Sequence, residues 1–334
     1  MNSIVSVMML ASVLVPAKGW YSPNEPINIL VKPPGAGGGG EITIVLTDFT
    51  NRQLSGDHPI TVGEEKTIDV KTILPEGMPG GTYLLYAVPA GNARKDFVGT
   101  PLVISVREDR RQGAQPGPMV VRIEPLAYVT LTTDQGPPMN IAFYYDVAPH
   151  TIGNFLKLTA EGYYDGLTFH RIVPDFIVQG GDPRGDGTGG PGYMIHEEFN
   201  PRPHLEGVLS MARTGDPNEA GGAMPRCEFA NSAGSQFFIC LKYENTKQLD
   251  RRYTVFGRVI DGMETVRNLG GVPLADEVTG KPKTAPKILN AEIKPVTAKE
   301  NPYLVIFEQV QGPSMLPTSR PAAGGAVPLE RPAP

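Results

Sequence analysis

The stretch that decides the fold is residues 168–190, which read TFHRIVPDFIVQGGDPRGDGTGG. Its first half holds apolar residues around Arg171 and Gln179, and its second half is rich in glycine. The glycine-rich half lacks the Gly-Lys-Ser/Thr ending of a phosphate-binding loop, so nucleotide binding is not indicated. Taken singly, Phe176 fits a core residue and Arg171 a surface salt-bridge partner. A function for either residue depends on what the rest of the chain adds.

The composition narrows the class of protein. The chain has 334 residues, a length typical of two domains, with 39 Gly and 34 Pro. Such content favours many turns and short strands over long helices. The formal net charge of −5 gives no indication of nucleic-acid binding. Two Cys and five His, with no His-Glu-x-x-His or Cys-x-x-Cys pattern, argue against a metal enzyme.

The N-terminus permits two interpretations. Residues 4–15 (IVSVMMLASVLV) are an uncharged apolar run of signal-peptide length, and residues 15–17 (VPA) fit a cleavage site. No Lys or Arg precedes the run, and the run is too short to cross a membrane. We favour a buried first strand over residues 11–16 and a cytoplasmic protein. Export is the alternative, if residues 1–17 are a signal peptide.

The first hundred residues predict an antiparallel β-sandwich. Short apolar segments separated by Gly/Pro turns lie at residues 27–32, 41–47, 67–70, 82–88 and 102–106. Their number and spacing favour a sandwich of two sheets. Residues 74–83 (LPEGMPGGTY) resemble the approach to the last strands of bacterial immunoglobulin-like domains, which implies an immunoglobulin-like sandwich. We assign residues 1–106 to this domain and the polar residues 107–119 to a linker. With no catalytic cluster here, we expect a spacer or a docking module for a protein partner.

The second region is expected to run over residues 120–311. Strands are predicted at residues 127–132 and 139–145, with a hairpin turn at residues 134–138. A helix should begin at residues 149–151, because Ile152, Phe155, Leu156 and Leu158 follow at helical spacing. Residues 312–334 hold six Pro, four Ala and three Gly. They cannot bury enough apolar surface to offset the entropy of ordering, so we predict a disordered tail.

Three further blocks complete the pattern: residues 207–212 (GVLSMA), 231–239 (NSAGSQFFI) and 249–258 (LDRRYTVFGR). In this order and spacing they resemble, with residues 168–190, the cyclophilin family of peptidyl-prolyl cis-trans isomerases, of bacterial type, from about residue 121 to 293. The resemblance implies an eight-stranded closed β-barrel with two helices. It also implies isomerisation of X-Pro bonds in peptides and unfolded proteins, and so assistance to protein folding.

The chemistry of this reaction fits the residues. Rotation about an X-Pro amide crosses a barrier of about 20 kcal/mol, because the conjugation of the C–N bond is lost. No covalent bond is made or broken, so no nucleophile, metal or cofactor is needed. The twisted amide needs a donor, and a guanidinium stays charged at any working pH. By the resemblance, Arg171 is this donor and Gln179 holds it in place.

The resemblance also assigns the residues that bind the substrate. Side chains would wall the proline pocket at Phe176, Ile177, Phe238, Leu249 and Tyr253. Backbone groups of Arg213 would anchor the peptide. The adjoining groove would be lined by Ala212, Thr214 and Gln236.

Three features depart from the family pattern. Gln248 stands where many members carry tryptophan. Tyr253 stands where many have histidine, although bacterial-type members often have tyrosine. Residues 219–230 (EAGGAMPRCEFA), which include Cys227, form an insertion that compact members lack. By its position this insertion borders the groove, where it would narrow substrate choice or cover the groove.

Two other classes of function compete with the enzyme. The barrel could be a non-catalytic, proline-peptide-binding or scaffolding module, or the main function could lie in the sandwich as an adhesion or docking domain. The joint presence of Arg171, Phe176, Gln179 and Phe238 favours the enzyme. We expect a monomer that acts on proline-containing peptides and unfolded protein clients, with no nucleic-acid partner and no membrane span.

Overall fold

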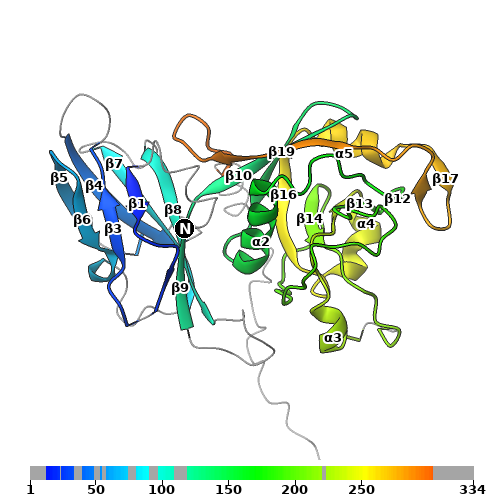
Figure 1. Ribbon diagram of the computed structural model, residues 1–334, viewed down its shortest axis with the longest axis horizontal. Coiled ribbons are helices and arrows are strands. Elements are labelled where there is room, and N and C mark those ends of the chain that lie inside the picture. Colours follow the sequence, from blue (N-terminus) through cyan, green and yellow to red (C-terminus); the bar gives the residue numbers. More distant parts are fainter. Residues whose placement is uncertain are drawn as a thin grey trace, which may run out of the picture.

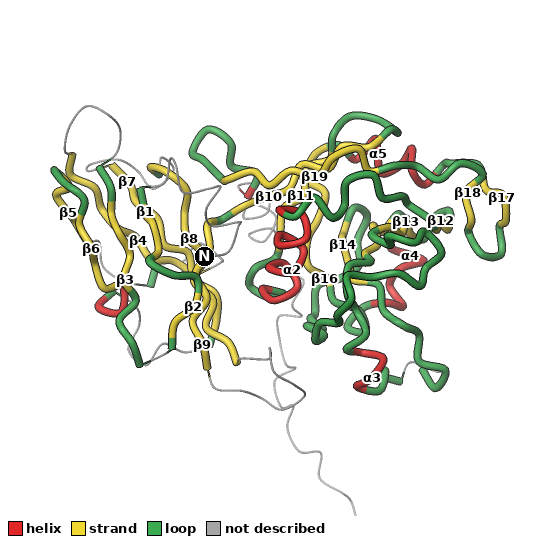
Figure 2. Tube along the Cα trace, viewed as in Figure 1, coloured by secondary structure: helices red, strands yellow, loops and turns green. Residues whose placement is uncertain are grey.

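The computed structural model describes residues 13–22, 24–33, 40–48, 53–54, 58–73, 80–89, 97–108, 119–219 and 223–303. The tail expected at residues 312–334 lies outside these ranges, as do most of the apolar N-terminal run and residues 109–118 of the expected linker. The fold is mainly β with a few helices, as the sequence predicts (Figures 1 and 2). Within the described ranges, no helix is both long and apolar enough to span a bilayer.

Two antiparallel sheets form the first part of the chain (Figure 1, left). The smaller sheet has the order β1 (Leu14–Pro16), β3 (Asn28–Val31) and β6 (Lys66–Asp69), and the short turn η2 (Val70–Thr72) follows β6. The larger sheet has the order β2 (Trp20–Tyr21), β9 (Met119–Pro125), β8 (Val98–Glu108), β7 (Gly81–Pro89), β4 (Gly40–Asp48) and β5 (His58–Val62). Each strand expected before residue 107 overlaps an observed strand.

The central strands of the six-stranded sheet are buried on both faces. Successive side chains of a strand point to opposite faces, so Ile44 of β4 packs in a core with the three-stranded sheet, whereas Val45 joins the core of the second part. In β7, Leu85 and Tyr86 divide in the same way. Burial on both faces explains why residues 82–88 are apolar almost throughout rather than at every second position.

Strand β9 belongs to this six-stranded sheet, where it pairs with β8 along its whole length. Its residues fall at the end of the expected linker and the start of the expected second domain. Val121 and Ile123 enter the first core, while Arg122 and Glu124 lie on the opposite face. Leu126 alone separates β9 from the next strand. Its amide donates to the carbonyl of Pro101 (2.8 Å), and its carbonyl accepts from the amide of Val296 (3.0 Å).

The second part is built on an eight-stranded antiparallel sheet. Its order is β12 (Arg171–Val173), β13 (Ile177–Gly180), β15 (Phe237–Cys240), β14 (Val208–Met211), β16 (Val255–Asp261), β11 (Met139–Phe143), β10 (Ala127–Thr133) and β19 (Ile288–Pro295). Strands β17 (Leu274–Asp276) and β18 (Lys281–Pro282) form a separate hairpin. The helices are α2 (Pro149–Ala160), α3 (Cys227–Ala230), α4 (Tyr243–Thr246) with the turn η4 (Lys247–Leu249), and α5 (Met263–Gly270).

Helix α2 lies between the two parts of the chain (Figure 1). It begins at Pro149, which is favourable in a first turn because that position needs no amide donor. The apolar residues that predicted this helix are buried, as expected. Phe155 stands at the centre of an aromatic cluster, with its ring centroid 4.8 Å from Tyr164, 5.5 Å from Phe237 and 5.3 Å from Phe256.

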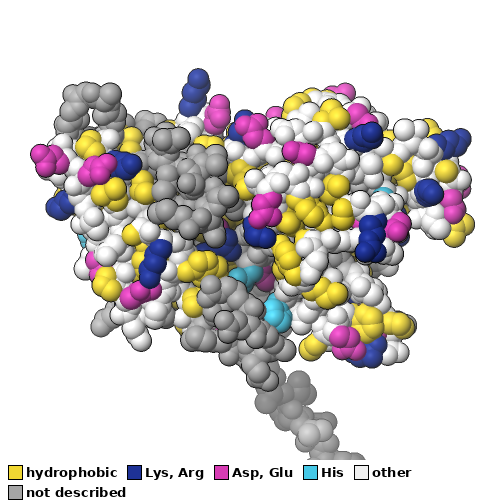
Figure 3. Space-filling view, in the orientation of Figure 1, with side chains coloured by type: hydrophobic (Ala, Val, Ile, Leu, Met, Phe, Trp, Pro, Cys, Tyr) yellow, Lys and Arg dark blue, Asp and Glu magenta, His cyan; other side chains and the backbone are white. Residues whose placement is uncertain are grey.

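Polar contacts also join the two parts. The Thr82 hydroxyl of β7 donates to the carbonyl of Tyr145 (3.0 Å). The guanidinium of Arg122 donates to the carbonyl of Pro149 (3.1 Å), at the start of α2. On the face shown in Figure 3, charged side chains of both signs are interspersed, and no extended patch of one sign stands out.

Candidate active site

The centre of the site is a row of side chains across neighbouring strands. In the β12–β13 hairpin Arg171 lies directly opposite Gln179, and Gln179 lies opposite Phe238 of β15. Residues opposite each other in antiparallel strands share one face of the sheet. The sheet therefore brings together, on one face, the two residues expected to be catalytic and one wall of the expected proline pocket.

A chain of amide hydrogen bonds holds the guanidinium of Arg171. Its Nη1 donates to Oε1 of Gln179 (3.2 Å), and Nε2 of Gln179 donates to Oε1 of Gln236 (3.0 Å). Gln236 in turn donates to the carbonyls of Gly187 (3.0 Å) and Gly189 (2.8 Å) in the glycine-rich loop. The carbonyls of this loop thus hold the last link of the chain.

The apolar residues expected to form the proline pocket lie beside this row. The rings of Phe238 and Tyr253 meet edge to face, with centroids 5.8 Å apart. Phe176, Leu249 and Ala212 are partly buried against the same core. Ile177 is buried and shares the face of Gln179, two residues along β13.

His204 packs against Phe238, and the sequence analysis did not single it out. Its ring stacks on Phe238 with centroids 6.0 Å apart. Its Nδ1 lies 2.8 Å from a carboxylate oxygen of Asp250, and its Nε2 lies 3.1 Å from the hydroxyl of Ser210. Burial lowers the pKa of His204 despite the nearby carboxylate. The ring, held at both nitrogens, packs against Phe238 and keeps it in place.

A groove with a volume of about 710 Å³ lies next to the Arg171 row. Its lining includes Ala212, Arg213, Thr214 and Gln236. Gln179 also borders the cavity, so the groove and the catalytic row share a wall. Gln248 lies outside it, exposed, with its amide donating to the carbonyl of Asn245 (3.1 Å).

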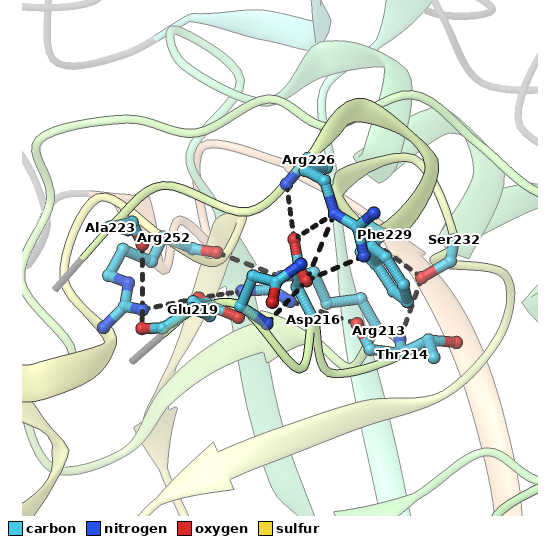
Figure 4. A network of polar contacts seen from close by, with 10 residues as sticks. Arg213, Thr214, Asp216, Glu219, Ala223, Arg226, Phe229, Ser232 and Arg252 are labelled. Atoms are coloured by element: carbon cyan, nitrogen blue, oxygen red, sulfur yellow. Dashed lines mark hydrogen bonds and ion pairs between the residues drawn. The ribbon is translucent and has the colours of Figure 1, made fainter. Parts of the chain in front are cut away.

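The described residues of the insertion, 219 and 223–230, are held by ion pairs (Figure 4). Asp216, just before it, is buried and accepts from Nε of Arg226 (3.1 Å), and this guanidinium holds the pKa of the Asp216 carboxyl well below its usual range. Ser232, just after it, accepts from the amide of Thr214 (2.8 Å). Cys227 is a free, exposed thiol at the start of α3.

Comparisons with known proteins assign the part of the chain that holds this site to a family. Residues 128–293 match the model of the cyclophilin type peptidyl-prolyl cis-trans isomerase/CLD family. A peptidyl-prolyl cis-trans isomerase of Synechococcus elongatus is 45% identical over 141 residues, which are 42% of this chain and 86% of that protein. Peptidyl-prolyl cis-trans isomerase B of Bacillus subtilis is 42% identical over 147 residues, 43% of this chain and 92% of that protein. Since the similarity spans nearly the full length of these relatives and the matched region contains the Arg171 row, the chain belongs to the cyclophilin-type peptidyl-prolyl cis-trans isomerase family.

Proposed function

We propose that this chain is a peptidyl-prolyl cis-trans isomerase that acts on X-Pro bonds of peptides and unfolded proteins. The observation that carries the proposal is the row Arg171–Gln179–Phe238, which sets a positioned guanidinium beside an aromatic pocket wall. Rotation about an amide requires these two features and no redox or bond-breaking group. Membership of the family supports the same activity.

The proposed mechanism stabilises the twisted amide. As the C–N conjugation is lost, the prolyl nitrogen becomes pyramidal and regains a lone pair. Arg171 donates to that nitrogen or to the neighbouring carbonyl, while Gln179 keeps the guanidinium oriented. Because the donor is already in place, little reorganisation is needed at the moment of rotation.

The remaining residues bind the peptide. The prolyl ring would lie in a pocket whose walls are Phe176, Ile177, Phe238, Leu249 and Tyr253. The backbone of Arg213 would hydrogen-bond the peptide beside the X-Pro bond. The groove of Ala212, Thr214 and Gln236 would hold neighbouring substrate residues, which its volume of about 710 Å³ supports.

Isomerase activity is tested on the full chain with a short X-Pro peptide. Exchange spectroscopy by NMR measures the cis-trans rate directly, and the expected result is exchange far above the uncatalysed rate. Binding of the peptide without faster exchange would instead support the non-catalytic scaffold.

The variant Phe238→Ala is expected to weaken ground-state binding. It removes the ring that packs edge to face against Tyr253, and with it the surface on which the prolyl ring of both isomers would rest. Peptide Kd should therefore rise about tenfold or more, while kcat changes less, because Arg171 and Gln179 remain paired. Calorimetric titration and exchange rates on the same preparation measure both effects. An unchanged Kd would show that Phe238 does not contact the bound peptide.

We further propose finer features of the fold. The eight-stranded sheet closes into a barrel, which is supported by bridges from Thr168 to both Asp182 and Lys287 near its two edge strands. The two N-terminal sheets form an immunoglobulin-like sandwich, which is supported by their antiparallel pairing around a shared core. Since β9 pairs with β8, we set the boundary between the two domains at Leu126.

The first domain is proposed to be a docking module for a protein partner. The central strands of its six-stranded sheet are covered on both faces within the chain. The surface left for a partner is therefore the outer face of the three-stranded sheet and the sheet edges. The chain is proposed to be a monomer, for which sedimentation equilibrium should return 35.9 kDa.

A fragment of residues 126–303 is expected to catalyse exchange but to be less stable than the same domain in the full chain. Excision exposes the core residues that Val45, Tyr86 and Val103 cover from the first domain. We expect the fragment to melt about 5 °C or more below the full chain, which corresponds to a loss of roughly 2 kcal/mol. Calorimetry on both proteins tests this, and equal melting temperatures would show that the contact between the domains adds nothing.

A further inference from the structure

The insertion carries a carboxylate that joins two arginine residues. Oε1 of Glu219 lies 2.5 Å from Nη2 of Arg213 and 2.8 Å from Nη2 of Arg252 (Figure 4). The side chain of Arg213 is only 2% exposed, and the other two side chains are largely buried. Charges removed from water depend on each other, because a buried guanidinium without a counter-ion is strongly unfavourable. Glu219 is therefore the counter-ion that allows the guanidinium of Arg213 to be buried.

Arg213 in turn touches both sides of the proposed binding site. Its Nε donates to the carbonyl of Arg252 (3.2 Å) and its Nη1 to the carbonyl of Thr214 (3.1 Å). Its guanidinium also lies 4.2 Å from the ring centroid of Tyr253, as a cation–π contact. The two hydrogen bonds fix the backbone at Thr214, which lines the groove, and at Arg252. The cation–π contact fixes Tyr253, a wall of the proposed pocket.

We propose that Glu219 is a positioning residue for peptide binding, which acts through Arg213 on Tyr253 and on the backbone of residues 213–214. This inference rests on the proposed function of the pocket. It makes the insertion a built part of the substrate site, because its first residue supplies the charge on which two walls depend. The Asp216–Arg226 pair and the Thr214–Ser232 hydrogen bond anchor the two ends of the same segment.

The expected effect is on binding rather than on rotation. Without the carboxylate, two neighbouring guanidinium groups lose their shared counter-ion, and Arg213 must leave its place under Tyr253. The described hydrogen bonds of Arg171 and Gln179 lead to Gln236 and the glycine-rich loop, and none of them leads to Glu219 or Arg252. The catalytic pair should therefore keep its geometry.

The experiment compares Glu219→Gln with Glu228→Gln in the full chain. Glu228 belongs to the same insertion and pairs with Arg226 at 3.2 Å, but its side chain is 63% exposed, and none of the described ion pairs joins it to Arg213. For Glu219→Gln, the Kd of a fluorescent Ala-Pro peptide and KM should both rise about tenfold, with kcat within about twofold of the parent. Glu228→Gln should match the parent in all three quantities.

A parent-like Kd and KM for Glu219→Gln would overturn the inference, as would a fall in kcat at unchanged Kd. If circular dichroism shows Glu219→Gln to be unfolded, Glu219→Asp replaces it. That variant keeps the charge but draws the carboxylate back by one methylene, so an intermediate Kd is expected and an unchanged one counts against the inference. If the parent binds the peptide but shows no exchange, the proposed function fails, whereas the Kd comparison still decides the role of Glu219.

Discussion

The variant Arg171→Ala should lose about two to three orders of magnitude in kcat/KM for X-Pro isomerisation. A preorganised donor in a site that excludes water contributes about 10²–10³ to turnover, and each factor of ten corresponds to about 1.4 kcal/mol of transition-state stabilisation. Peptide Kd should change much less, because the apolar walls bind both isomers and Arg171 acts mainly on the twisted amide. Exchange rates by NMR and peptide titrations on the same preparation measure both quantities.

Arg171→Lys is the matched variant. It keeps the positive charge but lacks the planar fork that donates to Oε1 of Gln179. It should therefore remain well below the parent in kcat/KM while binding peptide normally. Isomerisation by Arg171→Ala at the parent rate would show that the guanidinium is not the donor.

The second large effect is on stability, from Arg122→Met at the contact between the two parts of the chain. Nη2 of Arg122 lies 2.7 Å from Oε2 of Glu124, whose side chain is only 8% exposed. The guanidinium fills the space that Gly153 of α2 leaves, because a Cβ there would lie 1.9 Å from Nη2. Removing one partner of a buried pair leaves the other charge uncompensated, so the free energy of unfolding should fall by about 3–5 kcal/mol at neutral pH.

The deficit of Arg122→Met should depend on pH. Burial raises the pKa of Glu124 above its usual value, and the charge of Arg122 opposes that rise, so its loss raises the pKa further. A carboxyl group with a higher pKa in the folded state binds its proton more tightly when folded. Its contribution to stability is therefore present at low pH and is lost as the pH rises through the folded-state pKa. The deficit is expected to shrink as the pH falls towards the usual pKa of glutamate.

Urea denaturation of the full chain at neutral and acidic pH measures this. The double variant Arg122→Met/Glu124→Leu is the control, since replacing both charges with apolar groups should recover most of the stability. A deficit below about 1 kcal/mol at neutral pH, typical of an exposed pair, would show that this pair does not hold the two parts together.

The resemblance of four sequence blocks to one family predicts Arg171, Gln179 and Phe238 as site residues, and the structure places the three on neighbouring strands. Arg171 and Gln179 lie on the two arms of one hairpin, and Phe238 lies on the strand beside it. His204 could not be found in this way, because its partners Ser210 and Asp250 meet it only through the tertiary fold. The same holds for Glu219, since nothing in the order of residues shows that it reaches Arg252, 33 positions later in the chain.

In the N-terminal half, the strands could be predicted from the sequence, but the last strand and its buried charges could not. The strands before residue 107 follow the apolar pattern, yet β9 lies beyond a polar stretch that has the composition of a linker. Arg122 and Glu124 alternate with Val121 and Ile123, which is also the pattern of a strand with one face in water. Only the placement of α2 against that face turns these two charges into a buried contact.

The single residue between β9 and β10 has a consequence for how substrates reach the pocket. Leu126 is buried and hydrogen-bonded through both its amide and its carbonyl. This one-residue connection therefore fixes the orientation of the two domains relative to each other. If the first domain docks a partner protein, as we propose, that partner is held at a fixed distance and orientation from the proposed proline pocket. The length of unfolded chain between its docked segment and each X-Pro bond would then set which of its prolines reach the pocket.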